Sequence, residues 1–154
     1  MAFPFNRKLS KSYIYLLKFI VLQFFLISII PAMQIGHLSD LKWGKRIIII
    51  VDDENFEFNN RAKKYQKELE ERDISIIFYN KGIAYLDNKI ISDRFSKSVE
   101  KKIKSRKSRY SLILVGRDGG VKNTYLYETE LRAIFNDIDK MPMRKYEMRK
   151  SIKN

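Results

Sequence analysis

The sequence predicts an α/β fold in which a four-stranded mixed sheet is flanked by helices on both faces. Two apolar, β-branched runs, Arg46–Val51 and Ile74–Tyr79, have the composition of buried strands. A segment with helical periodicity lies between them, and a strand–helix–strand unit normally joins two parallel strands. A third apolar run, Tyr110–Val115, and an alternating segment after it extend the predicted sheet.

The first helix is predicted over Asn55–Arg72. Its apolar residues Phe58, Ala62, Tyr65 and Leu69 recur at helical spacing and form one stripe, whereas Glu and Lys occupy most of the other positions. A stripe of this kind marks the face that packs on a sheet. We therefore expect this helix to cover one face of the first two strands.

The segment between the second and third strands contains one further helix. Asn80–Ile90 holds a glycine and an Asp-Asn pair, which predict a loop or a short hairpin. Ser92 has the side chain of a helix N-cap, and Phe95, Val99 and Ile103 follow at the spacing of an inner helical face.

The last third of the chain reads as a hairpin followed by a helix. Asp118-Gly119 separates the third strand from the alternating segment Val121–Tyr127, and an Asp-Gly pair between β-rich runs favours a hairpin because the turn needs positive φ. A final helix is predicted over Thr129–Lys140, and Pro142 is expected to end it. The resulting order, βαβ, a helical insert and then ββα, is the thioredoxin-like arrangement.

Residues 1–36 have the composition of a secretory signal peptide. They contain four basic residues and no acid, and their apolar core is Phe19–Ile30. This core is shorter than the roughly 20 residues of a membrane span, so cleavage near Ala32 is favoured, with an uncleaved N-terminal anchor as the alternative. The sequence therefore predicts a secreted or periplasmic protein, membrane-anchored if the leader remains, with one domain over residues 37–154.

The composition excludes several classes of chemistry. The chain of 154 residues has no cysteine, which rules out disulfides, thiolate metal sites and cysteine nucleophiles. Its single histidine, His37, leaves no His-rich metal site, and nothing in the sequence resembles a Ser-His-Asp triad. No cofactor is predicted.

The chain is strongly basic, with a formal charge of +13. An excess of this size points to polyanionic partners. Export favours an anionic envelope polymer, a lipid surface or a protein partner over nucleic acid. A solvated helix face and a frayed basic C-terminal tail are the alternative. The residues predicted to contact a polyanion are Lys101, Lys102, Lys104, Arg106 and Lys107, with Arg144 and Arg149 as a second group.

The acidic residues after the first and third strands are candidate cation ligands. Asp52 and Asp53 follow the first strand and Asp118 follows the third, so they would converge if these strands were parallel neighbours. This is the basis of the alternative hypothesis, a divalent-cation-dependent enzyme. A response-regulator receiver is disfavoured because the third strand ends at Gly116 and not at an Asp. Acid near a helix N-terminus is the preferred interpretation of Asp52 and Asp53.

Two C-terminal motifs resemble a known family of exported proteins. The segments RDGGVK (Arg117–Lys122) and IDKMPMRKYEM (Ile138–Met148) are similar to its G-K/R-D-G-G-V-K turn and terminal M-P-M-R helix. Related domains occur in sushi-repeat-containing extracellular proteins. The resemblance implies a thioredoxin-like domain of unknown function without established catalysis. Its motif residues in this sequence are Arg117, Asp118, Gly119, Gly120, Met141, Pro142, Met143 and Arg144.

Together these observations favour a non-catalytic extracytoplasmic binding module. A thioredoxin-like scaffold without cysteine has lost the thiol chemistry for which that scaffold is known, which makes its surface the expected carrier of function. The basic clusters are the part of that surface with the strongest chemical character.

Overall fold

The computed structural model describes residues 35–53, 56–104 and 111–151. The predicted leader, its cleavage position and its alternative role as an anchor lie outside these ranges. No helix in the described ranges has the length and apolar character needed to cross a membrane.

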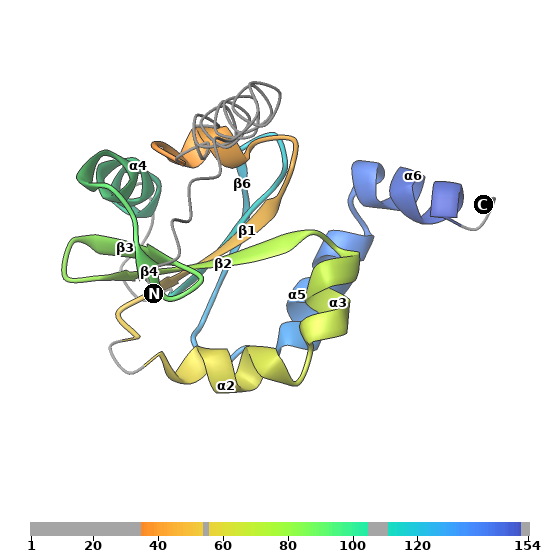
Figure 1. Cartoon of the computed structure of the whole chain (residues 1–154). Helices are drawn as coiled ribbons and strands as arrows, with labels where there is room; N and C mark the ends of the chain where they lie inside the picture. Colours follow the sequence, from red (N-terminus) through yellow and green to blue (C-terminus); the bar gives the residue numbers. More distant parts are fainter. Residues whose placement is uncertain (1–34, 54–55, 105–110, 152–154) are drawn as a thin grey trace, which may run out of the picture. The chain divides into compact units, whose positions relative to one another are not determined.

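The centre of the domain is a six-stranded mixed sheet with the strand order β4-β3-β2-β1-β5-β6 (Figure 1). β1 pairs in parallel with β2 and antiparallel with β5, and the remaining neighbours are all antiparallel. The strands are β1 (Arg46–Val51), β2 (Ile74–Asn80), β3 (Ile83–Leu86), β4 (Lys89–Ile90), β5 (Leu112–Val115) and β6 (Val121–Tyr125).

The prediction of four strands is wrong in number. The segment over residues 80–90 forms a hairpin whose two short strands, β3 and β4, continue the sheet beyond β2. Strands this short carry little periodic signal, and β4 has only two residues, both exposed. The α/β class, the mixed character of the sheet and the helices on both of its faces agree with the prediction.

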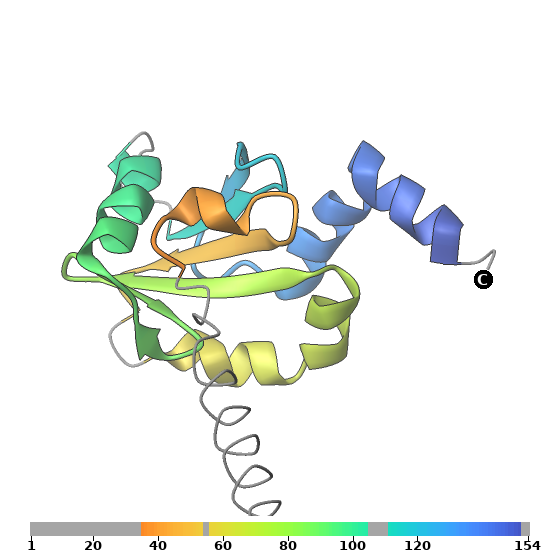
Figure 2. The same ribbon diagram turned by 45° about the horizontal axis from the view of Figure 1, so that its top comes forward.

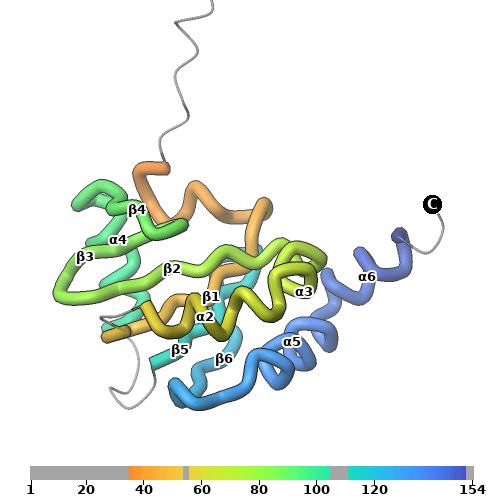
Figure 3. Tube along the Cα trace, turned by 60° about the horizontal axis from the view of Figure 1, so that its bottom comes forward, coloured from red at the N-terminus to blue at the C-terminus, as the bar shows by residue number. Residues whose placement is uncertain are grey.

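The two faces of the sheet are covered by different helices, because alternate side chains of each strand point to opposite sides. Ile48 and Ile50 of β1 point to the face covered by α2 (Glu57–Lys63), α3 (Gln66–Glu71) and α5 (Leu131–Asp139). Figure 3 shows these three helices lying together across that side. Burial of Ile47–Ile50 at 0–3% relative exposure confirms that β1 is a central strand.

The helix predicted over Asn55–Arg72 is divided in two, since α2 ends at Lys63 and α3 begins at Gln66. The predicted apolar stripe is nevertheless confirmed. Phe58, Ala62 and Leu69 are buried in the core of this face, and Tyr65, which lies in the break, packs against the same core. The break therefore keeps the apolar stripe on the sheet while changing the direction of the helix.

The opposite face is covered by α4 (Asp93–Lys104) and the short 3-10 helix η1 (Leu38–Leu41), which lie on the same side of the sheet in Figure 2. Ser92 caps α4 as predicted, because its Oγ accepts a hydrogen bond from the amide of Phe95 at 3.2 Å. Phe95 and Val99 are fully buried against the sheet, and Ile103 packs beside them.

The C-terminal region is helical, as the resemblance to a terminal M-P-M-R helix implied, and is not the frayed tail that was the alternative. Pro142 follows the end of α5 as predicted, but it is also the first residue of a further helix, α6 (Pro142–Ser151). Proline is favoured at this position because its missing N–H would have no partner in the first turn. α6 buries none of its residues and extends away from the sheet (Figure 1).

Candidate functional site

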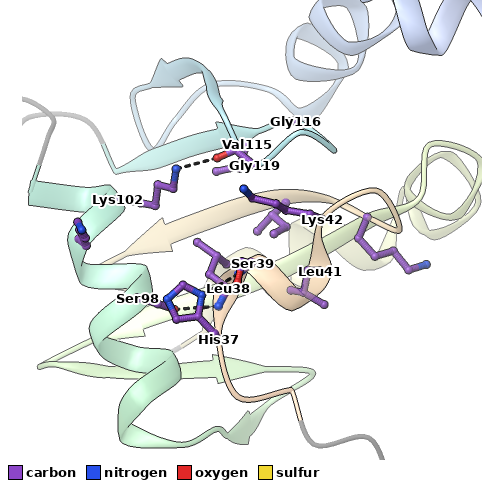
Figure 4. A pocket seen from close by; sticks show the side chains of 13 residues that line it. His37, Leu38, Ser39, Leu41, Lys42, Ser98, Lys102, Val115, Gly116 and Gly119 are labelled. Atoms are coloured by element: carbon purple, nitrogen blue, oxygen red, sulfur yellow. Dashed lines mark hydrogen bonds between the residues drawn. The ribbon is translucent and has the colours of Figure 1, made fainter.

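A pocket of about 430 Å³ opens between α4, η1 and the turn that joins β5 to β6 (Figure 4). Its floor is apolar. Ile47 and Val115, which are paired across β1 and β5, contribute from the sheet, and Leu38 and Leu41 contribute from η1. The pocket therefore lies at the edge of the sheet where β1 begins and β5 ends.

Lysine side chains surround this apolar floor. Lys42 and Lys45 come from the segment after η1, and Lys101 and Lys102 come from the last turns of α4. Among the residues that the structure describes, the pocket lining includes no aspartate or glutamate. Lys45 is 3.7 Å from Asp73, which lies outside the pocket, at an exposed ion pair that contributes little. The lining is thus positively charged around an apolar base.

The two lysines Lys42 and Lys102 converge on Gly119. The ammonium group of Lys102 donates a hydrogen bond to the Gly119 carbonyl at 2.7 Å (Figure 4). The Lys42 side chain lies over the same glycine, so that a Cβ at Gly119 would collide with Lys42 Cε. Lysine side chains from two separate segments of the chain therefore approach the same residue of the β5–β6 turn.

The turn itself is built to let these lysines approach. Gly119 has φ +75°, in the region where a side chain is strained, and its amide donates to the Gly116 carbonyl at 2.9 Å. Asp118 accepts hydrogen bonds from the Gly120 amide at 3.0 Å and from Lys122 at 2.6 Å. The hydrogen bond from Lys122, followed by that from Gly120, lowers the pKa of Asp118. The predicted hairpin is therefore confirmed.

η1 is held against α4 by a hydrogen bond between its first residue and a serine of α4. The Leu38 amide donates to Ser98 Oγ at 2.9 Å, across 60 positions of the chain. Asp40 accepts hydrogen bonds from the Gly36 and His37 amides at 3.0 and 2.8 Å, which fixes the start of the helix. His37 is at the pocket edge, where its Nδ1 is 2.7 Å from Ser39 Oγ. The lone histidine thus has a structural contact.

The predicted basic cluster on α4 is divided by the structure. Lys101 and Lys102 line the pocket, whereas Lys104 is exposed and pairs with Glu100 at 2.8 Å. Arg106 and Lys107 lie outside the described residues. Of the described members of the cluster, Lys101 and Lys102 therefore lie at the pocket and Lys104 does not.

Arg144 belongs to an arginine–carboxylate network and not to an open basic surface. Its side chain is 12% exposed, donates to the Glu71 carbonyl at 2.7 Å and pairs with Asp139 at 3.3 Å. It is also 3.7 Å from Glu147. The proposed role of Arg144 in polyanion contact is therefore disfavoured. Arg149, on the same helix, is exposed.

The same network fixes α6 to the domain. Buried Arg46, at the start of β1, donates to both carboxylate oxygens of Glu147 at 3.0 and 3.1 Å and to the Arg72 carbonyl at 2.8 Å. Arg117 contacts Asp73 and is 3.4 Å from Glu147. The network includes Arg46, Arg72, Arg117, Arg144, Asp73, Asp139 and Glu147.

Asp139 is the second acidic centre of this network. Arg72 donates to its two oxygens at 3.1 and 2.6 Å. Burial acts to raise the pKa of Asp139, but the hydrogen bonds and charges of Arg72 and Arg144 outweigh it, so the pKa is lowered. Several motif residues that suggested the family resemblance thus have a structural role.

The methionines of the M-P-M-R motif have different environments. Met141 packs against the core beneath α5, whereas Met143 is 44% exposed. Both line a second cavity, of about 290 Å³, together with Arg46, Arg117 and Pro142. Of the two methionines, only Met141 therefore contributes to the core.

The acidic candidates do not converge. β5 runs antiparallel to β1, so Asp52 and Asp53 follow the end of β1 at one edge of the sheet while Asp118 follows the end of β5 at the opposite edge. Among the described residues, no group of three His, Asp or Glu side chains is placed to hold a metal ion. The arrangement on which the cation-dependent hypothesis depended is therefore absent from this part of the chain.

Asp53 instead supports the start of α2. Its carboxylate accepts hydrogen bonds from the amides of Glu57 at 3.0 Å and Phe58 at 2.8 Å, and its carbonyl accepts one from Asn80 at 2.9 Å. The interpretation of Asp53 as an acid at a helix N-terminus is confirmed. Asp52 is exposed with φ 58° and does not share these contacts.

Sequence reasoning missed the lysines contributed from before β1. Lys42 and Lys45 lie in a short polar segment whose charge density is unremarkable, about 60 positions from Lys101. Their association with α4 depends on the tether between Leu38 and Ser98, which has no sequence signal. The combined site is therefore visible only after folding.

Comparison with known proteins identifies one family. The family described as "Domain of unknown function (DUF4174)" matches residues 37–147. No curated protein and no solved structure matches the chain.

Proposed function

The chain belongs to the family of unknown function DUF4174, and we propose that it is an exported, thioredoxin-like binding module that holds an anionic ligand at its lysine-lined pocket. The observation that carries this proposal is the pocket lining, in which the described residues contribute Lys42, Lys45, Lys101 and Lys102 and no acidic side chain. An anionic envelope component or the acidic surface of a partner protein has the complementary charge.

The thioredoxin-like part of the proposal is supported by strand order. The neighbours β2-β1-β5-β6 form a four-stranded mixed sheet, in which β1 and β2 are parallel and β5 is antiparallel to both of its neighbours. Helices cover both faces, with α2, α3 and α5 on one side and α4 on the other. In this view β3 and β4 are an addition at one edge.

The binding role is favoured over catalysis by the chemistry of the site. Lysine ammonium groups attract anions, and the pocket adds a histidine that contacts Ser39. Within the described ranges, the lining contributes no carboxylate that could act beside the lysines as a general acid or base. The extracytoplasmic location rests on the apolar leader sequence Phe19–Ile30.

The proposal is tested by binding of the full chain to immobilised heparin, an anionic polymer. We expect Lys42→Glu/Lys101→Glu to lower the salt concentration of elution strongly, because it reverses two charges of the pocket rim. The matched control is Lys63→Glu/Lys67→Glu, which makes the same charge change at exposed positions of α2 and α3. Equal shifts for the two double variants would show that heparin senses net charge alone, and the proposal would then fail.

A further inference from the structure

The lysine-lined pocket has a second property, accessible apolar surface beside its charges. Leu41 is half-buried at the pocket wall, whereas Ile47 and Val115 close the bottom of the pocket and are themselves buried at 3% and 0% exposure. The aliphatic stems of the lining lysines add to the apolar surface that Leu41 presents. This accessible surface indicates a ligand with an apolar portion as well as a charge.

We propose that the pocket binds a single-chain amphiphilic anion, in which a phosphate or carboxylate head is held by Lys42, Lys101 and Lys102 and an alkyl or acyl chain lies along Leu41 and the aliphatic stems of the lysines. This inference rests on the proposed anion-binding function and specifies its ligand class. The head would sit beside Gly119, where two lysine side chains already meet. Lysine binds phosphate as a point charge, so it suits either kind of head.

The size of the pocket selects a single chain. A volume of about 430 Å³ is in the range of small-molecule sites. At about 30 Å³ for each water-sized group it holds roughly a dozen non-hydrogen atoms. This corresponds to a head and a medium-length chain, and it is too small for a lipid with two long chains. The ligand is therefore a small amphiphile and not a bilayer surface.

The test compares three phosphates by isothermal titration calorimetry on the full chain: octyl phosphate, ethyl phosphate and inorganic phosphate. Each methylene buried in the pocket strengthens binding by about fourfold. Burial of about three to four methylenes against Leu41 and the lysine stems should make octyl phosphate bind on the order of 100-fold more tightly than inorganic phosphate, with ethyl phosphate between them. Chemical-shift changes at the methyl groups of Leu41 should accompany octyl phosphate binding.

Two pocket variants separate the contributions of charge and apolar surface. Lys101→Glu should weaken binding of both octyl and inorganic phosphate, whereas Leu41→Ser should weaken binding of octyl phosphate alone. The matched control is Lys104→Glu, which makes the same charge change one turn along α4, outside the pocket, and should leave both affinities close to wild type. If Leu41→Ser does not fold, the comparison of the three phosphates on the wild-type chain still decides the question.

The outcomes distinguish this inference from the proposed function. Pocket-dependent binding of heparin and inorganic phosphate without tighter binding of octyl phosphate overturns the amphiphile and leaves the anion site. Binding of octyl phosphate that survives Lys101→Glu and Leu41→Ser places the alkyl chain elsewhere on the protein and also overturns it. Pocket-dependent binding to phosphatidylglycerol vesicles, in place of the monomer, contradicts the single-chain ligand. Loss of every interaction with anions removes both proposals.

Discussion

Glu147 is the residue through which α6 is expected to contribute most to stability. α6 buries none of its residues, so its attachment to the domain depends on polar contacts. The Arg46 side chain is 2% exposed and donates to both oxygens of the Glu147 carboxylate, which is itself 23% exposed. Replacing Glu147 with alanine leaves a buried guanidinium without its counter-charge.

The size of the effect follows from this burial. Breaking a fully buried ion pair costs about 3–5 kcal/mol, because one charge is left without a partner. The partial exposure of Glu147 allows water to replace some of the lost interaction, and Arg46 keeps its hydrogen bond to the Arg72 carbonyl. We therefore expect Glu147→Ala to lower the free energy of unfolding by about 2–3 kcal/mol. Glu147→Gln, which keeps an acceptor and removes the charge, should be intermediate.

Urea denaturation followed by circular dichroism measures this change. With a slope typical of a small domain, the unfolding midpoint of Glu147→Ala should fall by about 1–2 M. Glu70→Ala is the matched control, because Glu70 is also a helical glutamate but is exposed. A surface substitution of this kind changes stability by less than about 0.5 kcal/mol. Equal midpoints for Glu147→Ala and Glu70→Ala would refute the idea that the network anchors α6.

Two further predictions concern the β5–β6 turn and the acidic centre of the network. Gly119→Ala should destabilise the domain by about 1–2 kcal/mol in the same urea assay, because Gly119 has φ +75°. Gly120→Ala, without positive φ, should cost less, and a larger loss for Gly120→Ala would contradict this reading. The lowered pKa of Asp139 contributes stability that is present above its ordinary value of 3.8 and is lost as the pH falls through the folded-state pKa. Asp139→Asn should therefore flatten the acid limb of the stability profile, and an unchanged slope below pH 4 would show that Asp139 does not supply it.

Most of the fold was accessible from periodicity. The β-branched run of β1, the stripe of Phe58, Ala62 and Leu69 and the Asp118-Gly119 turn all have the environments that local patterns predict. Long elements with one buried face leave a strong signal, since one face must be apolar along their whole length. The β3–β4 hairpin gives no such signal, because β4 has only two residues and both are exposed.

The position of Pro142 shows a different limit. A proline after a helical segment ends that helix, which is correct for α5, but it is equally compatible with the first turn of a new helix. α6 has no apolar stripe to reveal it, because its contacts with the domain are made by Arg144 and Glu147. Ion pairs impose no periodicity on the sequence, so this helix was interpreted as a basic tail.

The sequence by itself determined the absence of cysteine chemistry, the strong positive charge and the strand–helix order. These properties depend on composition and on local patterns, which need no knowledge of distant neighbours. The tertiary structure alone decided which charges act together. It placed Lys42 and Lys101 in the lining of one pocket. The antiparallel pairing of β1 and β5 separated Asp118 from Asp52 and Asp53. Arg144 became part of an ion-pair network with Asp139 and Glu147. A functional site depends on side chains brought together by folding, and strand direction, which sets that arrangement, is a property of the whole sheet.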